Sequence, residues 1–458
     1  MMSPLDSRVM DANAEALGVS VTELMGNAGK AVADFLDRRF PDRRIVFVCG
    51  PGNNGGDGFA AASLMDPRRV SVSLLKKPSE IHTDAAWHFY SELRCPIVDY
   101  SKTDLREYDV VVDCALGTGA RGDVREPYRS FIAASSDSGT VVSVDIPSGL
   151  GTDMSVHPVA TVTFHDIKEG MTRENSGEII IADIGIPAEA VDATGPGDML
   201  RYPVPGKCSH KGQNGRLMIV AGGPYFGAPI MASMSALRTG ADIVRLFTPE
   251  SIFDAVAEAS PVLMITRLSG DRLTTDSVEQ LLSESENYDA VLIGPGLGTD
   301  EDTMEAVRSF VSACKVPMVI DADGITAVVG MEFRGNVVLT PHHEEFRRLG
   351  GTCCPNELAE KLNAVVLLKG ATDEISDGRR TRLNRSGTPA MTGAGTGDVL
   401  AGATAALLSK GMTPFDSACL AAYICGRAGE YAFADKSYGL IATDVIDEIP
   451  HVLRDGLR

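Results

Sequence analysis

Residues 45–58 read IVFVCGPGNNGGDG, an apolar run that ends in a stretch of glycine, asparagine and aspartate. A short β-branched run of this kind is typical of a parallel strand buried on both faces. The glycines behind it allow positive φ angles or a close approach of the backbone to a ligand. The helix expected at residues 59–65 then offers free N–H groups to phosphate. A merely tight turn is the alternative, because a lone glycine-rich loop is a weak signal.

The run at 44–49 opens a series of similar runs. Amphipathic helical stretches at 84–93 and 128–135 separate them, and residues 10–40 predict one or two helices outside the sheet. The further expected strands are 70–75, 109–114, 140–145 and 160–164. This alternation predicts an α/β fold with a doubly wound parallel sheet.

A second, different series follows residues 194–215, whose Gly, Pro and polar residues are typical of a linker. Long Ala- and Gly-rich helices close it from residue 397 onward. Its expected strands are 216–222, 242–247, 290–296, 317–323, 337–339 and 364–370. Because the two series share no repeat, we predict two different α/β domains, at residues 1–205 and 206–458.

Composition excludes several classes of function. The net charge of −20 is divided between residues 1–205 (−11) and the remainder (−9), which argues against nucleic-acid binding through neutralised phosphates. No segment approaches the roughly 20 apolar residues that span a bilayer, and no apolar secretion core opens the chain, so a cytoplasmic location without membrane contact is expected. The nine cysteines form no CxxC pair, so neither a disulfide framework nor a thiolate metal site is expected.

Two later strand ends repeat the first pattern. Asp113 precedes the glycine-rich loop 117–123, and Asp145 precedes Pro147-Ser148-Gly149. Ligands gather beyond the carboxyl ends of strands in doubly wound sheets, so these loops are expected to share one cleft. Asn54, Asp113 and Ser148 offer hard oxygen ligands that suit a monovalent or alkaline-earth cation.

The same cleft contains candidates for proton transfer. Asp145 is a candidate general base, and Lys168, after the strand at 160–164, is a candidate cation or acid. Helix capping by a strand-end aspartate and a solvated lysine are the structural alternatives.

Four motifs in this order, GNNGGDGFAAASL, DCALGTGARGD, VDIPSGLGTD and ATVTFHDIKEG, resemble the NAD(P)HX epimerase domain, also called the YjeF N-terminal domain. The resemblance covers roughly residues 8–190 and implies a Rossmann-like fold. It implies that potassium is held by Asn54, Asp113 and Ser148, and that Asp145 with Lys168 interconverts the R and S epimers at C6 of the hydrated nicotinamide ring. The residues implied to bind the hydrate are Asn53, Asn54, Gly55, Gly56, Asp57, Gly117, Thr118, Gly119, Ala120, Arg121, Gly122, Asp123 and Asp145.

The second series carries its own candidate site. The turn GAGTGD, residues 393–398, opens a long helix and forms an anion hole for a transferring phosphoryl group. Asp398 in its first turn can accept a proton from a substrate hydroxyl, with helix N-capping as the alternative. Lys369-Gly370 follows a strand and is a candidate phosphate contact, whereas His342 by itself is more simply a turn histidine. The basic stretch 207–216 either faces phosphates or is a solvated linker.

The motifs HKGQNGRLMIVAGG, GPGLG, DADG, TPHHEEF, KGAT and MTGAGTGDVLAG resemble the NAD(P)HX dehydratase branch of the ribokinase-like superfamily, over about residues 207–455. The resemblance implies that Asp398 activates the C6 hydroxyl for phosphorylation and that loss of phosphate regenerates NAD(P)H. His343-Glu344 replaces the usual Pro-Gly, and GADI at 240–243 replaces GAGL. The residues implied to bind the hydrate are Gly240, Ala241, Gly296, His342 and Asp398, and those implied to bind ADP are Lys369, Gly370, Ala371, Thr372, Asp373 and Gly397.

The two resemblances together predict a bifunctional repair enzyme, an isomerase and a lyase. It would epimerise NADHX and NADPHX and dehydrate the S epimers at the expense of ADP, giving AMP and phosphate; the residues alone do not distinguish ADP from ATP as the donor. Magnesium is expected at the dehydratase site because phosphate charge needs neutralising, and relatives suggest a homo-oligomer, a tetramer or larger. A vitamin or sugar kinase fused to a nucleotide-binding scaffold domain is the alternative.

Overall fold

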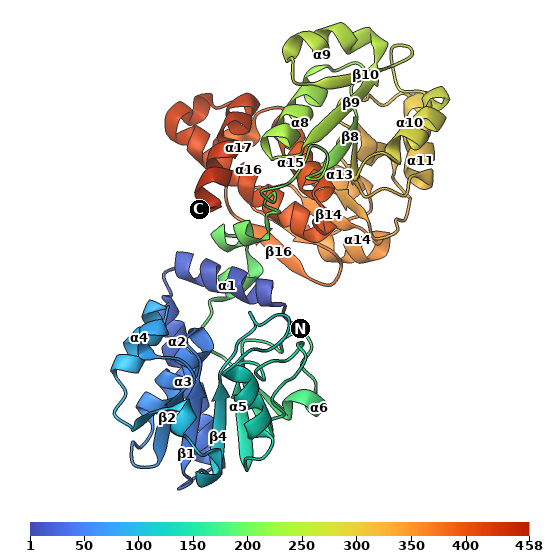
Figure 1. Ribbon diagram of the computed structural model, residues 1–458. Helices are drawn as coiled ribbons and strands as arrows, with labels where there is room; N and C mark the ends of the chain where they lie inside the picture. Colours follow the sequence, from blue (N-terminus) through green and yellow to red (C-terminus); the bar gives the residue numbers. More distant parts are fainter. Residues whose placement is uncertain (458) are drawn as a thin grey trace. The chain divides into compact units, whose positions relative to one another are not determined.

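The computed structural model describes residues 1–457, and these divide into two compact units, one of Met1–Ala190 and one from Val191 onward (Figure 1). Each unit has its own parallel sheet, and each sheet has a hydrophobic cluster on both of its faces. None of the helices in this described range combines the length and apolarity needed to cross a bilayer.

The sheet of the first unit has seven strands in the order β3-β2-β1-β4-β5-β6-β7, and every neighbouring pair is parallel. This confirms the predicted doubly wound, Rossmann-like sheet. The strands are β1 (Ile45–Cys49), β2 (Val70–Leu74), β3 (Ile97–Asp99), β4 (Val110–Cys114), β5 (Thr140–Val144), β6 (Ala160–Phe164) and β7 (Glu178–Ala182).

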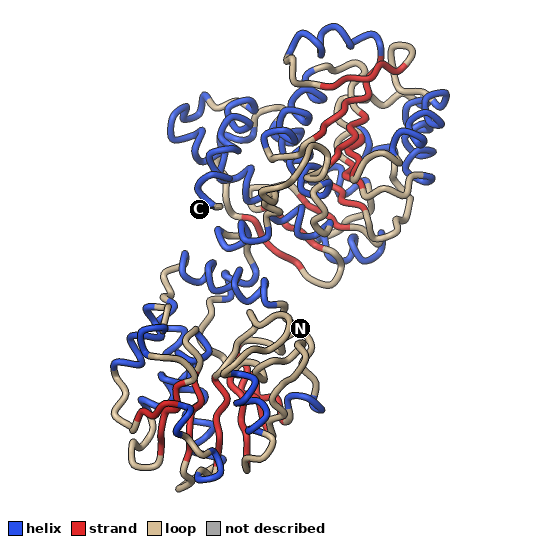
Figure 2. The backbone as a smooth tube through the Cα atoms, viewed as in Figure 1, coloured by secondary structure: helices blue, strands red, loops and turns tan. Residues whose placement is uncertain are grey.

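Helices cover both faces of this sheet (Figure 2). Phe47 of β1 packs into the cluster that contains Leu36 and Phe59, whereas its neighbour Val46 packs into the cluster that contains Phe131. Burial on both faces explains why β1 has no polar residue. The helices are α1 (Pro4–Ala16), α2 (Val21–Arg39), α3 (Asn53–Leu64), α4 (Asp84–Ser91), α5 (Tyr128–Ser135), α6 (Arg173–Ser176) and, at the junction of the units, α7 (Ala188–Asp192).

The glycine-rich stretch is helical, not a loop. Helix α3 begins at Asn53, six residues earlier than predicted, and none of the glycines in residues 52–58 has a positive φ. Close packing explains instead why glycine occupies these positions. A Cβ on Gly55 would overlap the carbonyl oxygen of Gly50, and one on Gly58 would lie 2.7 Å from the sulfur of Cys114. The glycines therefore let the helix start press against the ends of β1 and β4.

The sheet of the second unit has nine strands in the order β10-β9-β8-β11-β12-β13-β14-β15-β16. Strands β8 to β14 are parallel, and β15 and β16 add an antiparallel ribbon at one edge. The strands are β8 (Arg216–Val220), β9 (Ile243–Pro249), β10 (Met264–Leu268), β11 (Ala290–Ile293), β12 (Met318–Ile320), β13 (Val337–Leu339), β14 (Val365–Leu368), β15 (Asp373–Ser376) and β16 (Thr381–Asn384).

Helix α15 is buried along nearly its whole length, and a Cβ on Gly402 would overlap the carbonyl oxygen of Ala232 in α8. This close contact between two helices explains the Ala- and Gly-rich composition from residue 397 onward. The helices are α8 (Gly227–Arg238), α9 (Phe253–Ala259), α10 (Val278–Ser285), α11 (Glu301–Ala313), α12 (Asp323–Ala327), α13 (His343–Arg348), α14 (Pro355–Leu362), α15 (Thr396–Ser409), α16 (Pro414–Lys436) and α17 (Ala442–Gly456).

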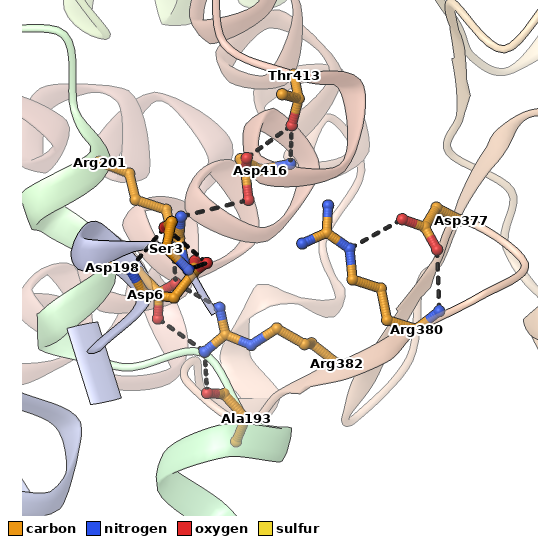
Figure 3. Close-up of polar contacts among 10 residues, drawn as sticks. All are labelled: Ser3, Asp6, Ala193, Asp198, Arg201, Asp377, Arg380, Arg382, Thr413 and Asp416. Atoms are coloured by element: carbon orange, nitrogen blue, oxygen red, sulfur yellow. Dashed lines mark hydrogen bonds and ion pairs between the residues drawn. The ribbon is translucent and has the colours of Figure 1, made fainter. Parts of the chain in front are cut away.

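The boundary between the units differs from the predicted one at residue 205. Residues 191–202, expected in the first domain and partly in a linker, pack into the second unit, where the Asp198 side chain is 0% exposed. Arg382 of β16 donates to both Asp198 and the carbonyl of Ala193, as Figure 3 shows. The glycine- and proline-rich segment is therefore not a flexible linker, because a buried ion pair holds it against the second unit.

Candidate active sites

A cavity of about 680 Å³ lies at the carboxyl ends of β1, β4, β5 and β6. Gly56 lies outside the lining, because it faces Met25 and Ala86 on the packed side of α3. Gly122 and Asp123 also lie outside it. The predicted residues that line the cavity are Asn53, Asn54, Gly55, Asp57, Gly117, Thr118, Gly119, Ala120, Arg121, Asp145 and Lys168.

Asp145 and Lys168 form an ion pair in this cavity. The Lys168 Nζ lies 2.7 Å from Asp145 Oδ1, and the lysine is only 3% exposed. Lys168 also donates to the carbonyl of Phe164 at 2.8 Å and to the hydroxyl of Thr163 at 3.1 Å. Asp145 has a φ of 62° directly after β5, a conformation that is costly for a residue with a Cβ and that recurs at functional sites. The pair is therefore rigidly held, and the ammonium stabilises a carboxylate that faces the cavity.

Two more carboxyl groups face the same cavity, from Asp57 on α3 and Asp11 on α1. Burial, and then the negative charges of Asp145 and Asp11, raise the pKa of Asp57 well above its ordinary value, against the opposing charge of Lys168. Burial and then Asp145 raise the pKa of Asp11 to about 6, again against Lys168. Sequence reasoning missed Asp11, since nothing in the local pattern shows which face of α1 meets the sheet.

The second unit gathers its candidate residues at the carboxyl ends of its parallel strands. Asp398 lies in the first turn of α15, whose N-cap Gly395 has a φ of 95°. A Cβ on Gly397 would lie 3.4 Å from Lys369 Nζ, so the ammonium sits against the start of this helix. Burial, and then Asp321, raise the pKa of Asp398 to about 7, although Lys369 opposes the shift. A carboxyl that titrates near neutrality beside a cation and a helix N-terminus suits general base catalysis next to a phosphate.

Lys369 pairs with Asp321, whose Oδ1 lies 2.9 Å from its Nζ. Burial opposes the charge of Lys369, but Asp321, Glu345 and Asp398 together raise its pKa above the ordinary value. Asp321 is buried at the end of β12 and also accepts from the Thr340 hydroxyl at 2.7 Å. Three strand ends therefore contribute to one charged cluster that keeps Lys369 protonated.

The predicted nucleotide loop follows β14 directly. The amide of Gly370 donates to Asp373 Oδ1 at 3.1 Å, and Asn384 donates to the other oxygen of Asp373 at 3.0 Å, so the loop is braced across Ala371 and Thr372. His343, which replaces a proline of the family pattern, lies against this loop, with its Nε2 3.5 Å from a Cβ built on Gly370.

Family models match both halves of the chain. The model described as YjeF-related protein N-terminus matches residues 21–170, and the model described as NAD(P)H-hydrate dehydratase matches residues 217–451. A protein of Pyrobaculum aerophilum described as a bifunctional NAD(P)H-hydrate repair enzyme Nnr is 40% identical, over 99% of this chain and 98% of its own length. A protein of Methanothermobacter thermautotrophicus with the same description is 39% identical, over 100% of this chain and 96% of its own length. The chain belongs to the family of bifunctional NAD(P)H-hydrate repair enzymes.

The second unit is similar in fold to solved structures. The ADP/ATP-dependent NAD(P)H-hydrate dehydratase from Bacillus subtilis, co-crystallised with ATP and Mg2+, is 26% identical with a TM-score of 0.51, covering 58% of this chain and 99% of its own. A ribokinase-like protein from Enterococcus faecalis, 22% identical with a TM-score of 0.53 over 58% of this chain and 96% of its own, shares the fold. These findings confirm the predicted pairing of an epimerase with a ribokinase-like dehydratase, and they favour it over the kinase alternative.

Of the predicted cation ligands of the epimerase unit, Asn54 lines the cavity, whereas Asp113 and Ser148 lie outside its lining and reach Asn54 through the carbonyl of Leu116. Asn54 donates to the carbonyl of Leu116 at 2.9 Å, whereas its buried Oδ1 has no hydrogen-bond partner in the described chain. The Asp113 carboxylate already accepts from Ser148 Oγ at 2.5 Å, Ser148 N and Ser143 Oγ at 2.8 Å each, and Ala115 N at 3.2 Å. Of the three residues, only Asn54 thus presents an oxygen that lacks a donor.

Two residues predicted for the dehydratase site do not lie there. Gly240 and Ala241 come just before β9, at the amino ends of the strands, where Lys410 at the end of α15 donates to the Gly240 carbonyl at 3.2 Å. Asp398 lies at the opposite end of the same helix. The structure therefore corrects the assignment of Gly240 and Ala241, because a motif's order in the sequence does not tell which end of a strand it occupies.

The glycine-rich turn Gly222-Gly223-Pro224 after β8 lies against Gly296, which follows β11, since a Cβ on Gly223 would lie 3.5 Å from the Gly296 carbonyl oxygen. Gly296 has a φ of 68°, and a Cβ there would lie 3.3 Å from the Cβ of Ala228 at the start of α8 and 3.0 Å from the carbonyl of Tyr225. The signal for this turn was present as Gly222-Gly223-Pro224 behind a buried strand. His342 caps α13, since its Nδ1 accepts from the amides of Glu344 and Glu345 at 3.1 and 3.3 Å.

Proposed function

We propose that the cavity of the first unit is the epimerase site and that Asp145 is its general base. The observation that carries this is the ion pair with Lys168 at 2.7 Å, which holds the Asp145 carboxyl group in the lining of a cavity of about 680 Å³. The hydrate contains a C6 that bears both a hydroxyl and the ring nitrogen. Removing the hydroxyl proton is the first step that opens this carbon to inversion, and Asp145 is placed for it.

The test uses the second activity of the chain as an internal control. Asp145→Asn keeps the shape of the side chain and should lower the epimerisation rate by at least about 10²-fold, the usual contribution of a general base. Dehydration of the S epimer by the same preparation should be unchanged. Normal epimerisation by Asp145→Asn would contradict the proposal.

For the second unit, we propose that Asp398 removes the proton of the C6 hydroxyl as that oxygen attacks the terminal phosphoryl group of ADP. The amides at the start of α15 and the ammonium of Lys369 would stabilise the transferring group, and AMP would leave. Loss of phosphate from C6 together with a proton from C5 then restores the ring of NAD(P)H. The loop Lys369–Asp373 with Gly397 would bind the nucleotide, and Gly296 and His342 the hydrate.

We further propose that potassium binds at Asn54 and magnesium at the nucleotide. The free Oδ1 of Asn54 fits a monovalent cation that prefers neutral oxygens, and Asp113 would orient Ser148 beside it. No group of three His, Cys, Asp or Glu side chains in the described part of the chain could hold a metal ion. Magnesium would therefore arrive on the phosphates, as is usual for this ion. Removing potassium should slow epimerisation alone.

One incubation tests the donor. The protein is mixed with both epimers of the hydrate and either ADP or ATP, and the recovery of reduced nicotinamide and inorganic phosphate is followed. ADP should support recovery at the higher rate. A stable phosphorylated product without recovery of the reduced cofactor would contradict the assignment.

A further inference from the structure

Helix α1 is anchored directly beside Lys168 of the proposed epimerase site. The amide of Met2 donates to the carbonyl of Ile167 at 2.9 Å, and the amide of Glu169 donates to the carbonyl of Met2 at the same distance. Met2, which directly precedes the N-cap Ser3, is thereby paired with the backbone on both sides of Lys168. Ser3 then caps the helix in a reciprocal pair of bonds with Asp6. The start of α1 is thereby fixed relative to Lys168.

One face of α1 forms a wall of the cavity. Pro4, Ser7, Arg8 and Asp11 all line it, and their spacing of three and four residues puts them on one helical face. Asp11 is the only carboxylate of that group. Asp11 lines the cavity and is exposed to solvent, although enough protein surrounds its carboxyl group to raise its pKa, so it can reach a bound ligand and exchange protons with solvent.

Epimerisation at C6 needs two proton transfers at two different atoms. When the hydroxyl loses its proton, the C6–oxygen bond becomes a carbonyl and the electron pair of the C6–N1 bond passes to the ring nitrogen, which must take up a proton. After rotation of the aldehyde, N1 adds to the other face, loses that proton, and the oxygen regains one. A single carboxylate serves one of these atoms, so the site needs a second group that gives and takes a proton.

We propose that Asp11 is this second acid–base residue, exchanging a proton with the ring nitrogen while Asp145 exchanges one with the C6 oxygen. The inference rests on the proposed role of Asp145. Lys168 is less suited, because Asp145, Thr163 and Phe164 already occupy its ammonium. Asp57 is the more enclosed carboxyl and belongs to the start of α3, which the family resemblance implies binds the hydrate.

The charges around Asp11 also support its role as the acid that protonates the ring nitrogen. Burial and Asp145 raise the pKa of Asp11 to about 6, so a fraction of Asp11 stays a neutral carboxylic acid near neutrality, in the same cavity as Asp145. That combination is the one the ring-opening step requires. The other titratable groups that line the cavity are Arg8 on α1, Asp57 on α3, His82 before α4, Arg121 after β4, Tyr128 on α5, and His165 and Lys168 after β6.

The test compares Asp11→Asn with Glu15→Gln, which removes an exposed carboxylate of the same helix outside the cavity lining. Asp11→Asn should lower kcat for epimerisation by at least about 10²-fold with little change in KM, and Asp11→Glu should recover part of the loss. Wild-type kcat/KM should fall on the alkaline side of Asp11's titration, and Asp11→Asn should lack that fall. Glu15→Gln should behave as wild type, and dehydration should continue in every variant.

Each outcome decides something. Epimerisation by Asp11→Asn within about threefold of wild type, or a rise in KM with kcat and the pH profile unchanged, would overturn the inference. If Asp145→Asn is inactive and Asp11→Asn is active, only the role of Asp11 falls. If both variants epimerise normally, the proposed function of the cavity falls with it.

Discussion

Asp398 combines two conflicting properties, since it must be ionised to act as a base yet lies where burial and Asp321 favour its neutral form. With its pKa raised to about 7, dehydration should speed up as the pH rises toward neutrality and level off above it. Replacing Lys369 with methionine removes the opposing positive charge, so the midpoint should move to higher pH. Profiles of kcat/KM against pH for the wild type and Lys369→Met measure this, and a profile that does not move would contradict it.

The same shift has a consequence for stability. A carboxyl whose folded pKa exceeds its unfolded value of 3.8 is stabilising below that value, and this contribution is lost as the pH rises to about 7. Asp398→Asn should therefore leave Tm nearly unchanged at pH about 4 and raise it at pH about 8, while abolishing dehydration. A variant with lower Tm at both pH values would show that Asp398 supports the fold as a helix cap.

Residues that act from strand ends could be predicted from the sequence, because a polar residue behind a buried apolar run has one available location. Asp145 and Lys168 were found in this way, and the structure places both in the cavity at the expected end of the sheet. Asp398 was found from the glycine-rich turn that opens a helix, and it lies in the first turn of α15. Asp11 could not be found, since its position depends on how α1 rotates against the sheet. Their roles, like the potassium site, the homo-oligomer and the cytoplasmic location, stay predictions.

At the scale of elements, the junction of β1 and α3 should tolerate no added methyl group on its packed side. Gly55→Ala would force a Cβ into the carbonyl of Gly50, and overpacking of this kind costs about 1–3 kcal/mol. Gly119→Ala is the matched control, since a Cβ there meets nothing within 4 Å. The only tryptophan, Trp87, lies in α4, so its fluorescence during urea unfolding reports on this unit. Equal stability of both variants would contradict the packing explanation.

The ion pair between β16 and residues 191–202 should matter more than any exposed pair. Arg382→Ala removes two donors from the fully buried Asp198, and breaking a buried pair in this way costs about 3–5 kcal/mol. Arg380→Ala breaks a partly exposed pair with Asp377 in the turn of the same ribbon (Figure 3) and removes the guanidinium from the Phe415 ring, 4.0 Å away. Each of these contacts is expected to contribute about 1 kcal/mol or less. Far-ultraviolet circular dichroism should show an earlier transition for Arg382→Ala, whereas the Trp87 fluorescence transition should not move.

Central strands could be read from the sequence, whereas edge strands could not. Strands β1 and β11 are buried on both faces and apolar throughout, whereas β4 and β8 each have a single charged residue, Asp113 near the end of β4 and Arg216 at the start of β8. The missed strands are short, polar or half-exposed and lie at sheet edges or in the antiparallel ribbon; these are β3, β7, β10, β15 and β16. Pairing with a neighbour, which no local pattern encodes, decides whether such segments become strands.

At the scale of the whole molecule, each unit contains a complete sheet, its own hydrophobic clusters and its own candidate site. The two reactions should therefore be separable and able to meet through solvent. Asp145→Asn alone should rapidly recover the S epimer only, and Asp398→Asn alone should recover none. An equimolar mixture of the two variants should recover both epimers nearly completely. The incubation must be too short for uncatalysed epimerisation, and the rate of that reaction is measured in a control without protein. Recovery would be followed by the absorbance of the reduced nicotinamide. A mixture that stops where Asp145→Asn alone stops would show instead that the hydrate must pass between sites of one chain.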